Sequence, residues 1–255
     1  MKVEFCKKWY LKTISKTIRS SEGLIKPVKI SVIIPCLNEA ENLKELIPYL
    51  LKNSNGNFSE VIVVDGGSTD DSIAIASSLG ALLIHSSITN RASQLNLGAR
   101  SANGDILYFI HADTRPVSNF AQIIRNCHQA GKSPGCFRYR FDSDKSMLKI
   151  NSWFTRFNGV FAGGGDQSLF IDKNQFFSLG EFDESYVVME DFDLVRRIRQ
   201  KTDFHVVQQN ILVSDRKYRE NSWLKVQLAN SVAFCLFLLK VKPASIKSLY
   251  LNLLK

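Results

Sequence analysis

The sequence predicts an α/β protein with a mostly parallel central sheet flanked by helices, and two observations support this fold class. Between residues 29 and 116, short runs of Val, Ile and Leu alternate with segments whose apolar residues recur at helical spacing. Each apolar run also stops abruptly at polar residues, as a buried strand does at the edge of a sheet. Strands that alternate with helices pair in parallel, because right-handed crossovers return each strand in the same direction.

The alternating part contains four expected strands and three expected helices. The strands are expected at 30–34, 60–64, 81–85 and 106–110, and the helices at 39–52, 73–79 and 91–102. Pro35 ends the first strand, and Thr69 or Asp70 can cap the second helix. Strand and helix thus follow each other without a long connection.

Beyond residue 116 the alternation loosens. Further helices are expected at 117–130, 189–200 and, in two pieces, 222–254, and further strands at 136–141, 168–171 and within 203–213. An aromatic-rich segment at 153–161 precedes three glycines at 163–165. No repeat or linker is visible. We therefore predict one domain, with a basic N-terminal extension at 1–28, the α/β domain at 29–215, and basic, apolar helices at 216–255 packed on it.

Polar side chains follow all four expected strands. They are Asn38 and Glu39, Asp65 and Ser68, His85, and His111 with Asp113. Because the carboxyl ends of parallel strands share one edge of a sheet, and ligands bind there, these residues are predicted to form a ligand site. The strand at 106–110 is central to this prediction.

Asp113 is the candidate metal ligand. The sequence has neither a G-x-x-x-x-G-K-[ST] loop nor a G-x-G-x-x-G turn, so a ligand's phosphates need another counter-charge. A carboxylate-bound Mg²⁺ or Mn²⁺ would supply it, since these ions keep substrate phosphates among their ligands. The alternative is that Asp113 only caps the turn before Pro116.

Three acids, Glu190, Asp191 and Asp193, stand at the start of an expected helix. One carboxylate is enough for an N-terminal cap, so a general base toward a hydroxyl group would account for the surplus. A plain cap is the alternative. The glycines at 163–165 permit close backbone approach, which suits an acceptor-binding loop or a simple turn.

The charge is unevenly distributed along the chain. Residues 1–29 carry a net charge of +6, residues 216–255 carry +7 and the middle carries −4, within a total of +9. The acidic middle lacks the basic stripe of a nucleic-acid binder, so no nucleic-acid partner is expected. The basic ends, including an amphipathic pattern at 3–19, favour contact with an anionic membrane surface, or are ordinary solvated helix faces.

The cysteines and the apolar segments indicate in which cellular compartment the protein is expected. The five cysteines are scattered without a C-x-x-C pair, as expected of reduced thiols in the cytosol. No secretory signal is visible, and the most apolar window, 231–239, is too short to span a membrane. We therefore expect a cytoplasmic protein, peripheral at the inner face of the membrane.

Taken together, these segments resemble motifs of the family 2 glycosyltransferases. The matching segments are 31–40 (SVIIPCLNEA), 63–70 (VVDGGSTD), 91–99 (RASQLNLGA), 111–113 (HAD), 165–167 (GDQ) and 189–191 (MED). The resemblance extends over residues 29–200. It is nearest to a small bacterial subgroup whose metal motif reads His-Ala-Asp where other members have Asp-x-Asp.

The resemblance implies a GT-A fold, the Rossmann-like architecture of nucleotide-diphospho-sugar transferases. It also implies inverting transfer from a nucleoside diphosphate sugar to a hydroxyl-bearing acceptor, such as a lipid or a small molecule. The donor-binding positions that it implies are Pro35, Asn38, Glu39, Asp65, Gly67, Ser68, Arg91, Asn96, Ala112 and Asp113. The Gln-x-x-Arg-Trp motif of processive members is absent, which favours a single transfer.

The resemblance further assigns roles to residues near the reacting groups. It implies that Asp113 holds a Mg²⁺ or Mn²⁺ ion that bridges the diphosphate. It implies that Asp191, beside Glu190, deprotonates the acceptor hydroxyl. The acceptor loop that it implies consists of Gly164, Gly165, Asp166 and Gln167.

Two other functions stay open on the sequence. A nucleotidyltransferase of similar fold would carry a Gly-rich, Arg/Lys-bearing loop after the first strand, where this chain has residues 35–39 (PCLNE). A catalytically inactive nucleotide-sugar-binding or membrane-docked scaffold protein would tolerate the histidine at position 111. Release of pyrophosphate would indicate a nucleotidyltransferase, and failure to bind any nucleotide sugar would indicate a membrane-docked scaffold.

Overall fold

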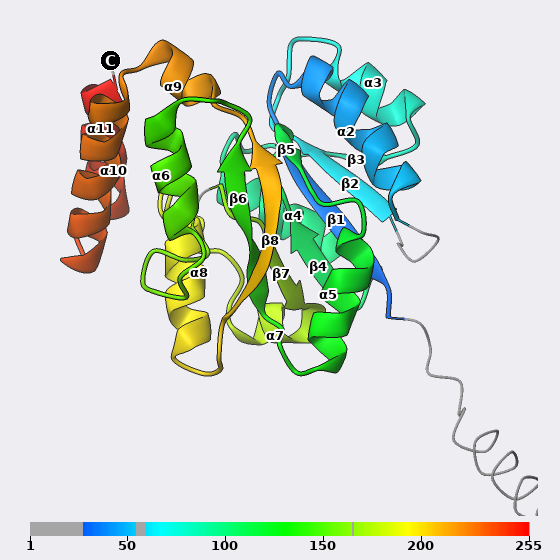
Figure 1. Ribbon diagram of the computed structural model, residues 1–255. Coiled ribbons are helices and arrows are strands. Elements are labelled where there is room, and N and C mark those ends of the chain that lie inside the picture. Colours follow the sequence, from blue (N-terminus) through cyan, green and yellow to red (C-terminus); the bar gives the residue numbers. More distant parts are fainter. Residues whose placement is uncertain (1–27, 55–59, 165, 255) are drawn as a thin grey trace, which may run out of the picture.

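The computed structural model describes residues 28–54, 60–164 and 166–254, which form one curled sheet with helices on both faces (Figure 1). The predicted amphipathic segment at 3–19 and Gly165 of the predicted acceptor loop lie outside these ranges. The described part confirms the predicted α/β class with a mostly parallel sheet.

The described strands form an eight-stranded sheet in the order β3-β2-β1-β4-β7-β6-β8-β5. They are β1 (Ile30–Cys36), β2 (Glu60–Asp65), β3 (Leu82–His85), β4 (Ile106–Phe109), β5 (Thr114–Arg115), β6 (Gly135–Phe141), β7 (Leu169–Asp172) and β8 (His205–Val213). The first four pair in parallel, whereas β7 runs antiparallel to both β4 and β6. The strand order reverses at β1, between β2 and β4, which is where open α/β sheets bind ligands.

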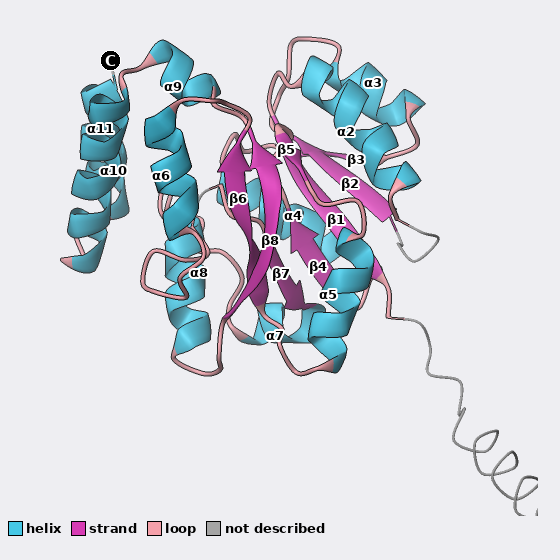
Figure 2. Cartoon of the chain, viewed as in Figure 1, coloured by secondary structure: helices cyan, strands magenta, loops and turns pink. Residues whose placement is uncertain are grey.

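Helices cover both faces of the sheet (Figure 2). They are α2 (Ala40–Lys52), α3 (Ser72–Ser78), α4 (Arg91–Ser101), α5 (Phe120–Gln129), α6 (Ser146–Phe154), α7 (Lys173–Ser178), α8 (Glu190–Arg199), α9 (Arg216–Glu220), α10 (Trp223–Leu238) and α11 (Pro243–Leu254). Buried side chains of α2, α3 and α5 share one core cluster, and those of α4, α7 and α8 share another on the opposite face. This burial on both faces explains why the central strands are apolar without alternation.

β1 is longer than predicted, because Pro35 does not end it. Pairing of β1 with β4 stops at Ile33, while pairing with β2 continues to Cys36. Proline has no N–H to donate, and on the β4 side no partner strand requires one at that point. The polar residues after Cys36 are therefore carried farther along the edge of the sheet.

Three short elements were not predicted: β5, α6 and α9. In α6 only Leu148 is buried, while its other apolar side chains are exposed, so the helix lacks the apolar inner stripe that marks amphipathic helices in a sequence. Residues 223–254 form α10 and α11, which pack against each other as a helical pair. None of the helices in the described part of the chain combines the length and the apolarity that a membrane crossing requires.

Candidate active site

A cavity of about 450 Å³ opens at the carboxyl ends of β1 and β4 and will be called the donor cavity. Residues at the ends of these strands, at the start of α4 and in the segment 214–218 after β8 line it. The predicted site residues that line it are Pro35, Glu39, Arg91, Ala112, Asp113 and Asp166, together with His111. The structure thus brings together residues from four of the six sequence motifs, 31–40, 91–99, 111–113 and 165–167.

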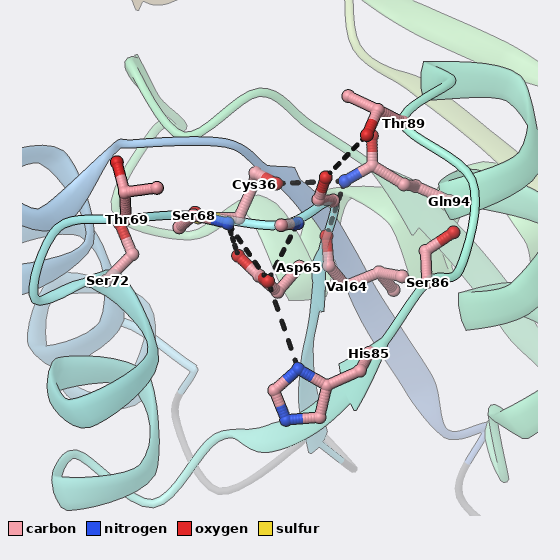
Figure 3. Close-up of polar contacts among 12 residues, drawn as sticks. Cys36, Val64, Asp65, Ser68, Thr69, Ser72, His85, Ser86, Thr89 and Gln94 are labelled. Atoms are coloured by element: carbon pink, nitrogen blue, oxygen red, sulfur yellow. Dashed lines mark hydrogen bonds and ion pairs between the residues drawn. The ribbon is translucent and has the colours of Figure 1, made fainter.

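Asp65 shapes the turn that follows β2 (Figure 3). Asp65 is buried, and its carboxylate accepts hydrogen bonds from the backbone N–H groups of Gly67 at 2.9 Å and Ser68 at 3.2 Å. Gly67 has φ +100, a conformation that residues with a side chain rarely adopt. Asp65 therefore holds the turn in place, and His85 lies at its side, with Nδ1 3.9 Å from an Asp65 oxygen.

Gln94 of α4 ties this turn to the end of β1. Its side-chain amide donates to the carbonyl oxygens of Cys36 at 2.9 Å and Val64 at 2.7 Å (Figure 3). A Cβ atom at Gly66 would come within 2.8 Å of the same amide nitrogen, so glycine is needed there for close approach. The sequence segment 91–99 thus contributes a buried side chain, Gln94, which lines the donor cavity and fixes the ends of β1 and β2 relative to each other.

Asn38 and Glu39 connect the end of β1 to other parts of the donor cavity. Asn38 has φ +56, and its side-chain oxygen accepts from the N–H of Thr69 at 2.8 Å. Glu39 forms an ion pair with Arg216 at 2.8 Å, although the two residues lie 177 positions apart in the sequence. Asn38 does not line the donor cavity, whereas Glu39 and Arg216 do.

Asp113 lines the donor cavity near Glu39 and Arg216. Burial raises the pKa of its carboxyl group, and the charge of Glu39 adds to that effect, while Arg216 opposes it. Over residues 28–54, 60–164 and 166–254, no three His, Cys, Asp or Glu side chains lie close enough to enclose a metal ion. One cavity-lining carboxylate nevertheless suits Mg²⁺ or Mn²⁺, which take remaining ligands from water and substrate phosphates.

The segment after β8 contributes cavity residues that were not predicted as site residues, among them Arg216, Lys217 and Tyr218. Burial raises the pKa of Tyr218 to about 12, so its hydroxyl group is neutral near pH 7 and can donate a hydrogen bond. Lys217 donates to Asn230 at 3.3 Å and to Tyr250, which anchors the segment to α10 and α11. In the sequence, Arg216, Lys217 and Tyr218 stand in the basic run that begins the C-terminal region, a segment that also fits the family subgroup with the His-Ala-Asp motif.

The predicted catalytic acids lie at the start of α8, next to Arg91. Glu190 is completely buried, and one of its oxygens pairs with Nε of Arg91. Asp191 is 14% exposed, and one of its oxygens lies 4.0 Å from Nη2 of Arg91. Because Arg91 lines the donor cavity, this cluster joins the start of α8 to the wall of that cavity.

The three acids at the start of α8 have different surroundings. Asp193 is buried and pairs with Arg196 at 2.6 Å and Arg197 at 2.8 Å, so it stabilises α8 itself. Glu190 is inaccessible to a substrate as long as it pairs with Arg91. Of the three acids, Asp191 is the one whose position and partial exposure suit contact with an acceptor.

Asn96, a predicted donor-binding residue, lies outside the donor cavity. It is 1% exposed, donates to the Phe182 carbonyl oxygen at 2.9 Å and to Glu184 at 2.9 Å, and accepts from the Phe182 N–H at 3.0 Å. These contacts tie α4 to the segment 182–184 ahead of α8. In this structure Asn96 therefore holds the framework together and does not face the cavity.

The residues of the predicted acceptor loop also differ in whether they reach the donor cavity. Gln167 is 4% exposed and binds backbone groups of Gly163, Phe137 and Thr155, so it braces the loop from inside. A Cβ atom at Gly164 would come within 2.0 Å of the Phe192 ring of α8. Only Asp166 of the four predicted residues, as far as they are described, lines the donor cavity.

Comparison with known proteins identifies the family. The sequence profile described as "Glycosyl transferase family 2" matches residues 31–177, more than half of the chain. The chain belongs to glycosyltransferase family 2. The matched region includes β1 to β7, and hence the strand ends that surround the donor cavity.

Two relatives of this family 2 member show how far the similarity extends. The chain is 28% identical over 183 residues to the PGL/p-HBAD biosynthesis glycosyltransferase of Mycobacterium tuberculosis, which covers 64% of the chain and 66% of that relative. It is 24% identical over 223 residues to an uncharacterized glycosyltransferase of Rickettsia felis, covering 79% of the chain and 36% of the relative. The chain thus spans less than two thirds of each of these relatives.

Solved structures confirm the GT-A fold of the glycosyltransferases. The mannosyltransferase PcManGT from Pyrobaculum calidifontis, in complex with GDP-Man and Mn²⁺, has a TM-score of 0.63 at 18% identity, covering 82% of this chain and 63% of that one. Glucosyl-3-phosphoglycerate synthase from Mycobacterium tuberculosis, in complex with phosphoglyceric acid, has a TM-score of 0.62 at 18% identity, covering 84% and 81%. At these identities the likeness concerns the fold.

Proposed function

We propose that this chain is an inverting, non-processive glycosyltransferase that moves a sugar from a nucleoside diphosphate sugar to a hydroxyl-bearing acceptor. The observation that carries the proposal is the donor cavity, which gathers Glu39, Asp113 and Arg216 beside Arg91 and its partner Asp191. Family membership supports sugar transfer, and neighbours in complex with UDP or GDP-Man support a nucleoside diphosphate donor.

The two arginines of the donor cavity are assigned to the diphosphate. A guanidinium group binds phosphate oxygens through paired, charge-assisted hydrogen bonds. The contact with Glu39 keeps Arg216 directed toward the end of β1, and the contact with Glu190 holds Arg91 in the wall of the donor cavity at the start of α4. The turn at 65–68 is assigned to the nucleoside, as the sequence motif implies.

Asp113 is assigned to a divalent cation, Mg²⁺ or Mn²⁺, shared with the diphosphate. Such an ion would supply Lewis-acid stabilisation of the departing nucleoside diphosphate. Solved neighbours contain Mn²⁺ or Mg²⁺ with nucleotide, which supports a divalent cation in the family. The role of Asp113 is to present an ionised carboxylate oxygen to the donor cavity, and the positive charge of Arg216 favours the ionised form of that carboxyl group.

Asp191 is assigned as the general base. Its carboxylate takes the proton of the acceptor hydroxyl while the hydroxyl oxygen bonds to the anomeric carbon of the sugar. The bond from that carbon to the diphosphate oxygen breaks on the opposite side, and this single displacement inverts the configuration. Glu190, which was predicted to be catalytic as well, is assigned a positioning role because it is buried against Arg91.

The acceptor and the location of the protein are assigned from the charge pattern. The net charge of +7 over residues 216–255 supports a peripheral protein at the inner face of a membrane. A lipid in that membrane is one class of acceptor that this location would supply. A small acceptor is equally compatible with transfer, since one neighbour was solved with phosphoglyceric acid. Asp166, at the edge of the donor cavity, is the acceptor-loop residue assigned to contact it.

The experiment that tests the proposed function is a screen of nucleotide sugars with the purified chain and Mg²⁺ or Mn²⁺. We expect calorimetric binding and release of the nucleoside diphosphate from at least one donor. Release of pyrophosphate would indicate a nucleotidyltransferase and contradict the proposal. Absence of binding for every donor, with and without the metal ion, would indicate an inactive scaffold.

Replacing Arg216 with glutamine is expected to weaken binding of the nucleoside diphosphate about 10- to 100-fold, because a charge-assisted contact with phosphate is lost. Calorimetric titration of the variant measures the change. Lys247→Gln is the matched control, since Lys247 is an exposed cation of α11 outside the donor cavity. Unchanged affinity in Arg216→Gln would exclude the assignment of Arg216 to the diphosphate.

A further inference from the structure

A second cavity, of about 420 Å³, lies between α6 and the strands β6 and β8. Its wall includes Arg138 and Arg140 from β6, Asn210 from β8, and Lys149 and Trp153 from α6. Phe141 lines both this cavity and the donor cavity, so the two are neighbours. None of the functions assigned above uses the second cavity.

The second cavity has an excess of positive charge. Its wall carries Arg138, Arg140, Lys149 and Arg156 against one carboxylate, Asp144, which is fully exposed and lies 3.4 Å from Lys149. Within the described residues the three arginines have no ion-pair partner, and the buried Nε atom of Arg138 has no hydrogen-bond partner. Cations held together without a counter-charge repel one another, so this arrangement favours an anionic ligand.

The outer face of α6 beside this cavity is apolar. Met147, Ile150 and Phe154 recur at helical spacing and are 43%, 49% and 61% exposed. Trp153 and Phe157 are 46% and 50% exposed, and their ring centroids lie 4.9 Å apart. A surface helix normally turns such a face inward, and a contiguous exposed apolar patch marks an interaction surface.

Trp153 joins the apolar face to the basic cavity. It lines the cavity, and the guanidinium group of Arg156 lies over its ring at 4.9 Å. Tryptophan prefers the headgroup level of a bilayer, and clustered lysines and arginines attract anionic lipids. The apolar helix face therefore matches the acyl-chain region of a membrane surface, and the basic cavity beside it matches the anionic headgroups.

We propose that the α6 surface docks on an anionic membrane. This surface consists of the exposed side chains Met147, Ile150, Trp153, Phe154 and Phe157 and the basic wall of the second cavity. The apolar side chains enter the interface, and lipid phosphate groups enter the second cavity. The proposal does not rest on the proposed transfer reaction, because docking needs neither donor nor acceptor.

The α6 surface is distinct from the basic ends of the chain, which the sequence had suggested as membrane contacts. Those ends are present in every variant of the full chain and affect all of them equally. Substitutions confined to the α6 surface therefore report on this surface alone. The measurement is flotation of the full chain with vesicles of phosphatidylcholine, with or without phosphatidylglycerol.

In the charge arm, Arg140→Gln/Lys149→Gln is compared with Lys44→Gln/Lys52→Gln, which removes two exposed cations from α2. We expect the wild-type chain to float with phosphatidylglycerol vesicles, and the cavity variant to bind them about 30-fold more weakly. The α2 variant should stay within a few-fold of the wild type. Equal losses in both variants would show that only the overall charge matters, and would overturn the proposal.

In the apolar arm, Phe154→Ser/Phe157→Ser is compared with Leu51→Ser, another exposed apolar side chain, on α2. We expect a loss of binding to phosphatidylglycerol vesicles in the first variant and none in the second. Far-UV circular dichroism verifies that both variants are folded.

Three outcomes would overturn the proposal. One is absence of flotation of the wild-type chain with phosphatidylglycerol vesicles. The second is flotation that both α6 variants leave unchanged. The third is calorimetric binding of inorganic phosphate, lost in Arg140→Gln/Lys149→Gln, without recruitment to vesicles, since this would identify the second cavity as a site for a free phosphate.

Discussion

Replacing Asp191 with asparagine is expected to lower turnover about 10²- to 10⁴-fold, while the affinity for the nucleoside diphosphate stays within a few-fold of the wild type. The amide has nearly the shape of the carboxylate but cannot accept the proton of the acceptor hydroxyl. Donor binding is retained because Asp191 does not line the donor cavity, where the phosphate-binding arginines are found. Turnover is measured as product formation, and affinity by calorimetry.

The matched control for this substitution is Asp203→Asn. Asp203 is an exposed aspartate in the loop after α8, so its replacement changes the charge by the same amount without reaching the cluster around Arg91. Its turnover should equal that of the wild type. Full activity of Asp191→Asn would contradict the assignment of the base, and a parallel loss of donor affinity would place Asp191 in donor binding.

Replacing Arg91 with methionine is expected to lower the free energy of unfolding by about 3 kcal/mol, because it leaves a buried carboxylate without its partner. Glu190 is completely buried, and its second oxygen already lacks a hydrogen-bond partner among the described residues. The Arg91 side chain is 35% exposed, so water partly screens the pair and the loss falls at the lower end of the range for buried pairs. Urea denaturation followed by circular dichroism measures the change.

Two further variants isolate the cause of that loss. Arg100→Met removes the same type of side chain from the same helix, but the Arg100 side chain is 54% exposed, so water screens its pair with Glu181 and about 0–1 kcal/mol is expected. Arg91→Met/Glu190→Gln removes both charges and should recover part of the stability, because a neutral amide is less costly to bury than an unpaired carboxylate. If the double variant were no more stable than Arg91→Met, the loss would have to come from packing.

The parallel half of the sheet could be predicted from the sequence, because its signals are local. The strands β1, β2 and β4 are runs of mostly apolar residues buried on both faces, and β3 is a shorter apolar run at the edge of the sheet. Each of the four is followed by turn residues that leave polar groups at the sheet edge. α6 could not be predicted in the same way. Most of its apolar side chains are exposed, so its sequence lacks the single buried apolar stripe by which an ordinary surface helix is identified. Pro35 was misleading because its effect depends on which neighbouring strand needs its N–H.

The sequence by itself determined the fold class, the family resemblance and the strand ends at which a nucleoside diphosphate sugar is expected to bind. Only the tertiary structure decided which motif residues line the donor cavity and which support it from outside, as Asn96 and Gln167 do. It also brought Arg216 to Glu39 and Glu190 to Arg91. Local periodicity reflects the contacts of a residue with its own helix or strand, whereas these pairs join residues about 100 or more positions apart, where no spacing rule applies.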